Sequence, residues 1–390
     1  MIRNTVAHVD LDALRANFRA IQEFLQDAPG GGGPQGAPRR RPAPAIIAVV
    51  KANAYGHGAD RVALALEEAG ATMLACADIE EGIVLRRAGV RVPILVFGAL
   101  SVSDLDGLFE YALTPTISSP GAARSVQAAA ARHRTTIACH LKIDTGMNRL
   151  GFRFDNLRRT LPEVLASRNL RLEAVFTHFA SADVPESPVF DDQRVHFEQA
   201  LATIDEVNDS ASASPTRPYV VHACNSAALL RDSRVWFDAV RPGLLLYGIV
   251  PPPLASTITL RPVMSLTSRV VAVKGLRPGE GVGYGWRYKP DGPRTIAVIP
   301  AGYADGLDTR LCGRGHVLIR GRRAPVVGSV CMDMLMADVT GMDVSPGDEV
   351  VLIGRQGDDR IDVREMAAVV GTIPWELVCR VGSRIERLYE

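Results

Sequence analysis

The sequence predicts an α/β fold: a (β/α)8 barrel of the TIM type followed by a mostly β C-terminal domain. Over the first two thirds of the chain, eight short apolar runs alternate with amphipathic segments. This is the pattern of parallel strands joined by helices, and at eight repeats it favours a barrel over an open sheet. After Pro251-Pro252-Pro253 the pattern changes to short β-branched runs broken by glycine turns, which indicates strands and tight turns. We therefore expect a barrel over 1–254 and a β domain over 255–390.

Length and composition set the class of protein. The chain has 390 residues, 47% of them apolar, and a formal net charge of +1, so it can bury a large core and has no charge that favours nucleic acid or an anionic membrane as partner. Its six cysteines form no CxxC pair, and most lie in apolar runs, where thiols pack as small hydrophobes rather than form disulfides or bind metal. The N-terminus is too polar for a secretory signal, and no apolar stretch is long enough to span a bilayer. We expect a cytoplasmic, soluble enzyme or binding protein.

The first elements are a helix and an insertion. Asp10–Gln26 places Leu11, Leu14, Phe18, Ile21 and Leu25 on one helical face. Residues 28–44 are rich in glycine, proline and arginine, a composition that cannot pack a core. They are expected to form a flexible surface loop, either a solvated insertion or, through Arg39-Arg40-Arg41, an interaction patch.

Strands and helices then alternate. The strands expected in the barrel are Ile46–Val50, Met73–Cys76, Ile94–Phe97, Leu113–Ile117, Ile137–Ile143, Leu172–Thr177, Tyr219–His222 and Phe237–Val240. The helical segments between them include Ile79–Ala88, Gly121–Arg134, Gln193–Val207 and Ala227–Arg231. No G-x-G-x-x-G follows any of these strands, which disfavours a dinucleotide-binding fold.

The C-terminal part is predicted to be mostly strand. The expected strands are Ser268–Val273, Thr295–Ile299, His316–Ile319, Val326–Val330 and Glu349–Ile353. One helix, Val363–Val370, is expected among them.

Lys51 is the first candidate for chemistry. Only four of the forty-four basic residues are lysines, and Lys51 ends the apolar run Ile46–Val50. Burial would favour the neutral amine of such a lysine. A neutral amine can form a Schiff base with a carbonyl, whereas a guanidinium stays protonated and cannot. On spacing alone, Lys51 also fits a surface lysine just past a strand.

Other chemically capable side chains follow the remaining strands. In a barrel, active-site groups come from the carboxyl ends of several strands, and here those positions hold Tyr55, Lys142, Asp144, Arg149, His178, Asn225, Ser226 and Arg241. Ser226 begins a helix and Gly243 follows Arg241-Pro242. Barrels hold a phosphate with a helix N-terminus and a glycine after the last two strands. The same two residues also fit an ordinary N-cap serine and a turn glycine.

The run Ala48-Val49-Val50-Lys51-Ala52-Asn53-Ala54-Tyr55-Gly56-His57-Gly58 resembles the cofactor-lysine signature of alanine racemases. The similarity continues, in family order, through the segments 142–151, 177–183, 222–226, 241–243, 283–285, 302–306 and 331–333. The resemblance implies a pyridoxal 5'-phosphate barrel with a β domain, acting as a homodimer whose active site is shared between subunits. The implied activity is interconversion of L-alanine and D-alanine by two-base proton transfer on a pyridoxal-phosphate aldimine, supplying D-alanine for peptidoglycan of the bacterial cell wall.

The resemblance also assigns catalytic roles residue by residue. Lys51 would hold the cofactor and act as one base, and Tyr284 of the β domain would be the other base, in the site of the partner subunit. Racemisation needs a proton acceptor on one face and a donor on the other, which two different bases provide. A free tyrosine is a poor base at neutral pH, so His178 and Arg241 are expected to supply nearby positive charge. Arg241 would also face the pyridine nitrogen of the cofactor.

The remaining carried-over residues bind the cofactor or the substrate. The cofactor-binding set is Lys51, Tyr55, Arg149, Asn225, Ser226, Arg241, Gly243 and Leu244. Arg149 and Met332 would contact the substrate carboxylate. Lys142 matches the lysine that is carbamylated in many members of the family, where it orients that arginine. No metal site is expected, nor a nucleic acid or membrane partner.

Two positions depart from the family pattern, and other readings stay open. Aligning the tail puts Ser383 where many members have a phosphate-contacting tyrosine, and Ser329 where others have an arginine, so the width of the substrate channel is an open question. A racemase of other small amino acids such as serine, a pyridoxal-phosphate decarboxylase and a non-catalytic cofactor-binding protein are the alternatives. The form of Val330-Cys331-Met332-Asp333 speaks against the decarboxylase, and a binding protein built from the barrel alone would lack Tyr284.

Overall fold

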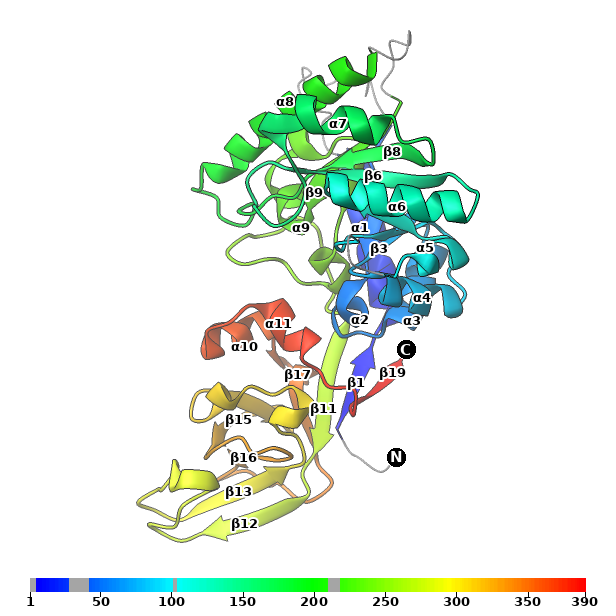
Figure 1. Cartoon of the computed structure of the whole chain (residues 1–390). Helices are drawn as coiled ribbons and strands as arrows, with labels where there is room; N and C mark the ends of the chain where they lie inside the picture. The colour runs from blue at the N-terminus through cyan, green and yellow to red at the C-terminus, as the bar shows by residue number, and fades with distance from the viewer. Residues whose placement is uncertain (1–4, 28–41, 101–103, 210–217) are drawn as a thin grey trace.

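The structure, a computed structural model, describes residues 5–27, 42–100, 104–209 and 218–390. Figure 1 shows two lobes, a barrel with its helices above and a β domain below. The insertion predicted at 28–44 falls largely on residues 28–41, which lie outside the described residues.

Eight of the described strands form the predicted barrel. They are β2 (Ala45–Val49), β3 (Met73–Cys76), β4 (Ile94–Val96), β5 (Thr114–Ile117), β6 (Ile137–Asp144), β8 (Leu170–Phe176), β9 (Val220–Asn225) and β10 (Ala239–Arg241). Neighbours pair in parallel, and the β10–β2 and β5–β6 pairings close the ring. Each predicted barrel strand overlaps one of these, with ends that differ by at most three residues, so the barrel is confirmed. A short strand, β7 (Phe152–Arg153), adds to β6 outside the ring.

Helices surround the barrel, and capping residues in the sequence mark where some of them begin. Asp78 and Ser119 cap two of them, each side chain accepting a hydrogen bond from the amide three residues on, which satisfies an N–H that the helix leaves unpaired. The helices of this lobe are α1 (Leu11–Asp27), α2 (Lys51–Tyr55), α3 (Ala59–Glu68), α4 (Ile79–Arg87), α5 (Asp106–Glu110), α6 (Pro120–Arg132), α7 (Leu157–Leu165), α8 (Val189–Asp209) and α9 (Ser226–Arg231). Short 3-10 turns cover Phe154–Asn156, Ser233–Val235 and Leu244–Tyr247.

The second lobe is built on a ten-stranded sheet. Its order is β12-β13-β16-β15-β14-β17-β11-β1-β19, with β18 paired to β17. The strands are β1 (Val6–Val9), β11 (Met264–Arg269), β12 (Ala272–Leu276), β13 (Arg294–Ile299), β14 (His316–Ile319), β15 (Arg322–Val327), β16 (Leu335–Asp338), β17 (Glu349–Gln356), β18 (Asp359–Ile361) and β19 (Glu386–Tyr389). Helices α10 (Val363–Val370) and α11 (Pro374–Cys379) lie on the side of this lobe that faces the barrel (Figure 1). The mostly β class of this part is confirmed.

The first strand departs from the expected division of the chain. β1 pairs antiparallel with β11 and parallel with β19, so residues 6–9 belong to the second sheet although they precede the barrel (Figure 1). The predicted strand Ser268–Val273 is in fact two strands, because Val270 and Val271 turn away to bond Asp348 and Val298. Likewise Val326–Val330 covers the end of β15, and residues 328–330 are not strand.

No helix in the described ranges is both long enough and apolar enough to cross a membrane.

Candidate active site

A cavity of about 520 Å³ opens at the carboxyl ends of the barrel strands. Ten of the twelve predicted site residues line it: Lys51, Tyr55, Lys142, Arg149, His178, Asn225, Ser226, Arg241, Gly243 and Leu244. Each stands at or just after the carboxyl end of a barrel strand. Because the strands are parallel, these ends meet at one face of the barrel and bring the residues together. Ligand sites in proteins typically enclose ~300–1,000 Å³, so the cavity has room for a cofactor with a small substrate.

Lys51 begins an unusual helical turn. The four residues that follow it have φ between 52° and 54°, so α2 is a left-handed turn made of non-glycine residues. Such a conformation costs about 1–2 kcal/mol per residue, and strain of this kind persists only where surrounding contacts hold it. The Glu81 carboxylate provides one such contact, accepting hydrogen bonds from the Ala52 amide at 2.6 Å and the Ala77 amide at 2.8 Å.

The far end of the turn is held by buried groups. The His57 ring is buried, and its Nδ1 lies 2.9 Å from the carbonyl oxygens of both Ala54 and Tyr55. At Gly56, where φ is +83°, an added Cβ would lie 2.1 Å from the Val378 oxygen of α11. The turn is therefore fixed between the barrel and the second lobe, and it sets the direction in which Lys51 and Tyr55 leave the backbone.

Burial governs the charge of the Lys51 amine. Burial is the main cause that lowers the pKa of Lys51 below its usual value, and the positive charge of Arg149 lowers it further. Burial, then Arg149 and Arg241, also lower the pKa of Lys142 to about 8. Both amines are therefore nearer to their neutral, nucleophilic form than exposed lysines are.

One end of the cavity is lined by hydroxyl groups and by backbone that comes close to them because a glycine stands there. Gly243 N donates to Ser226 Oγ at 3.0 Å, and a Cβ at Gly243 would lie 2.6 Å from Tyr55 Oη. The Asn225 side chain caps α9 by accepting from the Ala228 amide. Hydroxyl groups, a helix N-terminus and a close backbone approach are the donors that phosphate groups require, so this end fits the phosphate of pyridoxal phosphate.

Arg241 lies buried at the cavity, and hydrogen bonds hold its guanidinium in one orientation. Its Nη2 donates to the carbonyl oxygens of Thr177 and Ala223 at 2.8 and 2.9 Å, and its Nη1 lies 2.8 Å from His222 Nδ1. His178 Nδ1 lies 3.4 Å from Nη2. Burial lowers the pKa of Arg241 to about 10, and burial together with Arg241 lowers the pKa of His178 well below its usual value. At neutral pH the pair is thus a cation beside a neutral imidazole.

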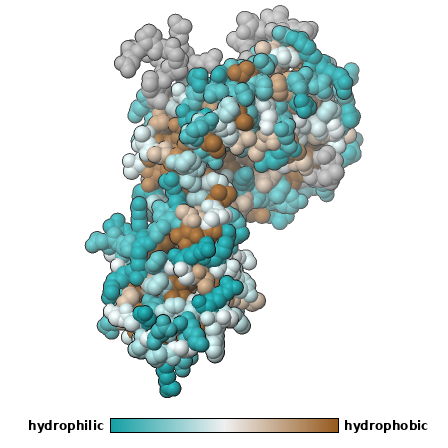
Figure 2. Space-filling model, turned by 90° about the vertical axis from the view of Figure 1, so that its left-hand side faces the viewer, coloured by the Kyte–Doolittle hydropathy of each residue, from teal (hydrophilic) through white to brown (hydrophobic). Residues whose placement is uncertain are grey.

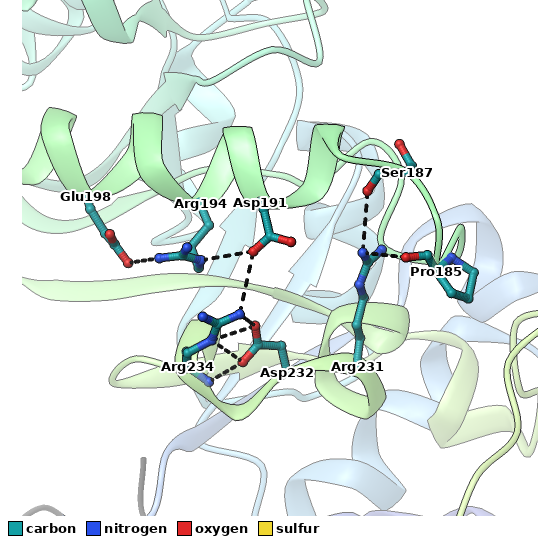
Figure 3. Close-up of polar contacts among 8 residues, drawn as sticks. All are labelled: Pro185, Ser187, Asp191, Arg194, Glu198, Arg231, Asp232 and Arg234. Atoms are coloured by element: carbon teal, nitrogen blue, oxygen red, sulfur yellow. Dashed lines mark hydrogen bonds and ion pairs between the residues drawn. The ribbon is translucent and has the colours of Figure 1, made fainter. Parts of the chain in front are cut away.

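The rim of the cavity is fastened by Arg231 at the end of α9 (Figure 3). Its guanidinium donates to the carbonyl oxygens of Ser181, Val184, Pro185 and Ser187 and lies 4.2 Å from the centre of the Phe190 ring. The segment it holds includes Asp183, which lines the cavity. The helix that begins at the phosphate-like end therefore also secures one wall of the cavity.

The two predicted residues of the β domain lie outside the cavity. Tyr284 is 76% exposed and Met332 is 52% exposed. Their loops lie together, since Ser329 Oγ donates to the backbone carbonyl oxygen of Tyr284, and the Ala304 amide donates to the backbone carbonyl oxygen of Met332. Three further exposed hydrophobic residues stand on the same loops: Trp286, Tyr303 and Met334. Ser383 is exposed and is not a cavity residue.

Other cavity residues were not among the predicted site. Asp183 falls in the motif 177–183, but its position on the rim is a tertiary result. Trp375, from α11 of the second lobe, also lines the cavity. The sequence signals the helix only through Pro374, a residue suited to a first turn, and nothing in the sequence points it toward the barrel.

Comparison with known proteins gives one consistent result. Residues 37–251 match the family model "Alanine racemase, N-terminal domain" and residues 263–389 match "Alanine racemase, C-terminal domain". The chain is 40% identical over 390 residues to alanine racemases of Halothermothrix orenii and Symbiobacterium thermophilum, an alignment that covers 100% of this chain and 97% of each relative.

Solved structures agree. An alanine racemase of a D-cycloserine-producing Streptomyces lavendulae superposes with a TM-score of 0.89 at 33% identity, over 100% of this chain and 98% of that one. An alanine racemase of Bacillus anthracis with bound L-Ala-P gives 0.87 at 35%, over 100% and 96%. An alanine racemase of Bartonella henselae with covalently bound pyridoxal phosphate gives 0.83 at 27%, over 99% of each chain.

Proposed function

The chain belongs to the alanine racemase family, and from that premise we propose how its residues interconvert L-alanine and D-alanine. It is an isomerase that depends on pyridoxal phosphate. The observation that carries the assignment of roles is the cavity itself. A lysine with a lowered pKa, a directed arginine cation and a set of phosphate-type donors meet there at the strand ends.

The donor set fits the cofactor. Tyr55, Ser226, Gly243 and Leu244 would hold the phosphate with help from Asn225, Lys51 would attach the cofactor, and Arg241 would face the pyridine nitrogen. Arg149 would contact the cofactor and, together with Met332, the substrate carboxylate. When bound, pyridoxal phosphate supplies the electron sink that makes the α-proton of an amino acid acidic.

Lys51 acts as the base on one face of the substrate. Burial favours its neutral amine, which can accept the α-proton of D-alanine and return it at the same position. Because Lys51 begins a turn that buried contacts hold, the direction in which its side chain leaves the backbone is set before substrate binds, which reduces the orientation to be gained during the reaction.

Tyr284 acts as the base on the other face, and a second subunit supplies it. Tyr284 stands exposed among apolar side chains on the second lobe, which is the character of an interface and not of a free surface. In a homodimer this loop would enter the partner's cavity, where the Arg241 cation, beside the neutral His178 ring, would provide positive charge for the tyrosine hydroxyl oxygen. The expectation that His178 also carries a positive charge does not agree with its lowered pKa. The β domain, proposed to span 255–390, would thus complete the site of the barrel at 1–254.

The cellular role follows from the product. D-alanine is proposed to serve peptidoglycan of the bacterial cell wall. The six cysteines are all unpaired thiols, which is the state favoured by the reducing cytoplasm, and we assign the enzyme to that compartment.

Isotope exchange in deuterated water tests the two bases. In Tyr284→Phe, racemisation should collapse in both directions because each direction needs both groups. Exchange of the α-proton without inversion should survive for D-alanine, whose proton faces Lys51, and be lost for L-alanine. Lys51→Ala should lose both exchanges together with covalent attachment of the cofactor, as borohydride reduction and peptide mapping would report.

A single base that serves both faces would behave differently. Tyr284→Phe would then retain exchange with both enantiomers, and that result would overturn the two-base assignment. Alanine racemase activity of the unaltered protein, followed by a coupled assay for D-alanine, is the reference for each variant.

A further inference from the structure

Two hydrogen bonds and a longer polar contact lead from Arg241 through the barrel interior to a carboxylate. Arg241 Nη1 lies 2.8 Å from His222 Nδ1, and His222 Nε2 lies 3.0 Å from His140 Nδ1. His140 Nε2 faces Glu173 Oε2 at 4.0 Å. Arg241 and both histidines are at most 3% exposed, whereas the Glu173 side chain is 39% exposed. These contacts therefore join a buried cation to an anion that reaches solvent.

The arginine end fixes the position of every proton. A guanidinium can only donate, so His222 Nδ1 must accept and the proton of this ring must be on Nε2. That N–H donates to His140 Nδ1, which leaves the proton of His140 on Nε2, directed toward Glu173. Only one arrangement of protons satisfies all the contacts, and in it both rings are neutral.

The surroundings keep the two rings in that state. Burial, then the charge of Arg241, lowers the pKa of His222 well below its usual value and that of His140 to about 3. The Phe176 ring stacks on His222 at 4.7 Å between centroids and meets His140 edge-on. The charged groups that face the pair are Arg241 from β10 and Glu173 from β8, and Arg171 of β8 lies 3.6 Å from Glu173.

Arg241 has no carboxylate of its own among the described residues. None of the ion pairs between them includes it, and the other groups that accept its hydrogen bonds are two carbonyl oxygens and a histidine. A buried cation is costly unless its charge is balanced. Glu173 can balance this charge through two hydrogen-bonded polarisable rings, the second of which directs its Nε2 toward the carboxylate at 4.0 Å.

The backbone is shaped to bring Glu173 into this position. Cys139 pairs with Leu172 and the next residue, His140, pairs with Ala174, so Glu173 is an extra residue in β8. A bulge of this kind redirects a side chain. On a regular strand Glu173 would point away from the face that carries Ala174 and His140.

We propose that His222, His140 and Glu173 are positioning residues that hold Arg241 as an oriented cation and so tune the racemase reaction from the far end of the barrel interior. None of the three lines the cavity, so they act through Arg241 and not on substrate. The inference rests on the proposed role of Arg241 toward the cofactor ring.

Nitrogen NMR of the two rings tests the proton arrangement without any assay of activity. In protein labelled with ¹⁵N-histidine, with and without cofactor, both rings should show a protonated Nε2 and a bare Nδ1. This should hold from about pH 6 to about pH 8, where a free imidazole titrates. His222→Gln and His140→Gln assign the signals. A protonated Nδ1 on either ring, or an imidazolium in this range, would overturn the proposal.

Kinetics of matched variants test the effect on Arg241. His222→Leu removes the acceptor and should lower kcat by roughly 10- to 100-fold, by analogy with the loss of groups that orient metal ligands in other sites. His222→Gln keeps one acceptor and one donor and should recover most of that loss. Glu173→Gln keeps the shape and removes the charge. It should lower kcat by roughly tenfold, leave KM for alanine nearly unchanged and shift the cofactor absorption band.

The control is Glu163→Gln, which removes an exposed carboxylate that pairs with Arg124 on the helical surface and should behave as the unaltered enzyme. If His222→Leu does not fold, the comparison of Glu173→Gln with Glu163→Gln decides. Equal kcat in those two, or a folded His222→Leu with full activity, would overturn the proposal. A protein that shows the expected protons but no racemase activity would instead contradict the proposed function.

Discussion

Lys142 lies among cations at the cavity. Arg149, Arg241 and Lys51 all act to lower its pKa, and Asp144 is the acid that acts against them. With burial as the main cause, the pKa of Lys142 falls from 10.5 to about 8. At pH 7 roughly one amine in ten is then neutral, against about one in three thousand for a free lysine. A carbamate would replace an unfavourable positive charge by a negative one beside Arg149.

Lys142 is therefore expected to take up CO2 as a carbamate. Its neutral fraction rises as pH rises through about 8, so at constant dissolved CO2 the carbamate should increase over that range. Carbon NMR with ¹³C-bicarbonate measures it. Lys142→Arg should abolish the signal, because a guanidinium stays protonated, whereas Lys274→Arg, at an exposed position, should retain it. A signal that survives in Lys142→Arg, or none at any pH, would contradict this expectation.

Single residues differ in how far the sequence could predict them. Lys51, Lys142, His178, Ser226 and Arg241 could be expected at the site because each lies at or just after the carboxyl end of a strand, and parallel strands end at one edge. Tyr284 had no such geometric signal, and its role came from the resemblance. Glu81 and Glu173 were missed, since one acts from a helix and the other through a bulge, and neither position can be read from hydrophobic periodicity.

At the scale of elements, α2 contradicts local propensity most strongly. Alanine is the best former of right-handed helix, yet Ala52 and Ala54 are left-handed here. Contacts from Glu81, His57 and α11 hold the turn, so it is a tertiary result that local sequence does not predict. The same conflict makes the turn a sensitive place to test backbone strain.

Ala52→Gly should raise the midpoint of thermal unfolding. Glycine removes about 1–2 kcal/mol of left-handed strain and costs about 0.4–1 kcal/mol through the unfolded chain, so the net gain is up to about 1.6 kcal/mol. Ala52 is exposed, so little packing is lost. Ala128→Gly, at an exposed position inside α6, is the matched control and should lower the midpoint by a comparable amount. Equal effects of the same sign at the two sites would show that the turn is not strained.

Arg231→Gln should loosen the rim segment that Figure 3 shows fastened to α9. Four carbonyl oxygens between Ser181 and Ser187 lose their donor, so amide exchange over 181–188 should accelerate. Each hydrogen bond from a charged group contributes about 1.5–3 kcal/mol to stability, so the loss of these bonds should free the segment that carries Asp183. Because Asp183 lines the cavity, we expect kcat/KM for alanine to fall roughly tenfold. Hydrogen–deuterium exchange with mass spectrometry and steady-state kinetics measure the two effects.

Arg234→Gln is the control for Arg231. This neighbour pairs with Asp232 and Asp191 near the surface, where ion pairs contribute little, so both exchange and kinetics should stay close to those of the unaltered enzyme. Slow exchange over 181–188 in Arg231→Gln would mean that the segment is held by other contacts.

Most elements of the barrel could be predicted from sequence, and those of the second lobe less completely. Barrel strands are buried on both faces and read as continuous apolar runs. β16, β18, β19 and α11 were missed, because they are short and several are only half buried. β1 was missed for a different reason. It pairs with β11, more than 250 residues away in sequence, and only the assembled sheet gives those four residues a partner.

For the whole molecule, the arrangement of the lobes supports the proposal that two copies of the chain complete each site. The paired strands β1 and β11 connect the barrel to the second lobe (Figure 1), and α11 packs on the left-handed turn. Figure 2 shows apolar surface where the two lobes meet. Trp375 reaches the cavity of its own chain, whereas Tyr284 and Met332 stand exposed on loops outside it. These positions favour the proposal that Tyr284 is supplied to Lys51 by another copy of the chain.

Mixing two inactive variants tests this requirement. Lys51→Ala supplies an intact Tyr284 and Tyr284→Phe supplies an intact Lys51, so a heterodimer contains one site with both bases and one with neither. Under subunit exchange at equal concentrations about half the dimers are mixed. Activity should therefore rise from near zero to roughly a quarter of that of the unaltered enzyme.

The time course of recovery should follow subunit exchange, measured independently by mass spectrometry of isotopically labelled chains. Mixing each variant with itself provides the baseline. A double variant carrying both substitutions, mixed with either single variant, should recover nothing, because no site could then contain both bases. Activity that stays at baseline while the labelled chains demonstrably exchange would mean that each subunit carries its own complete site. Tyr284 would then have to reach Lys51 by movement of the second lobe within one chain.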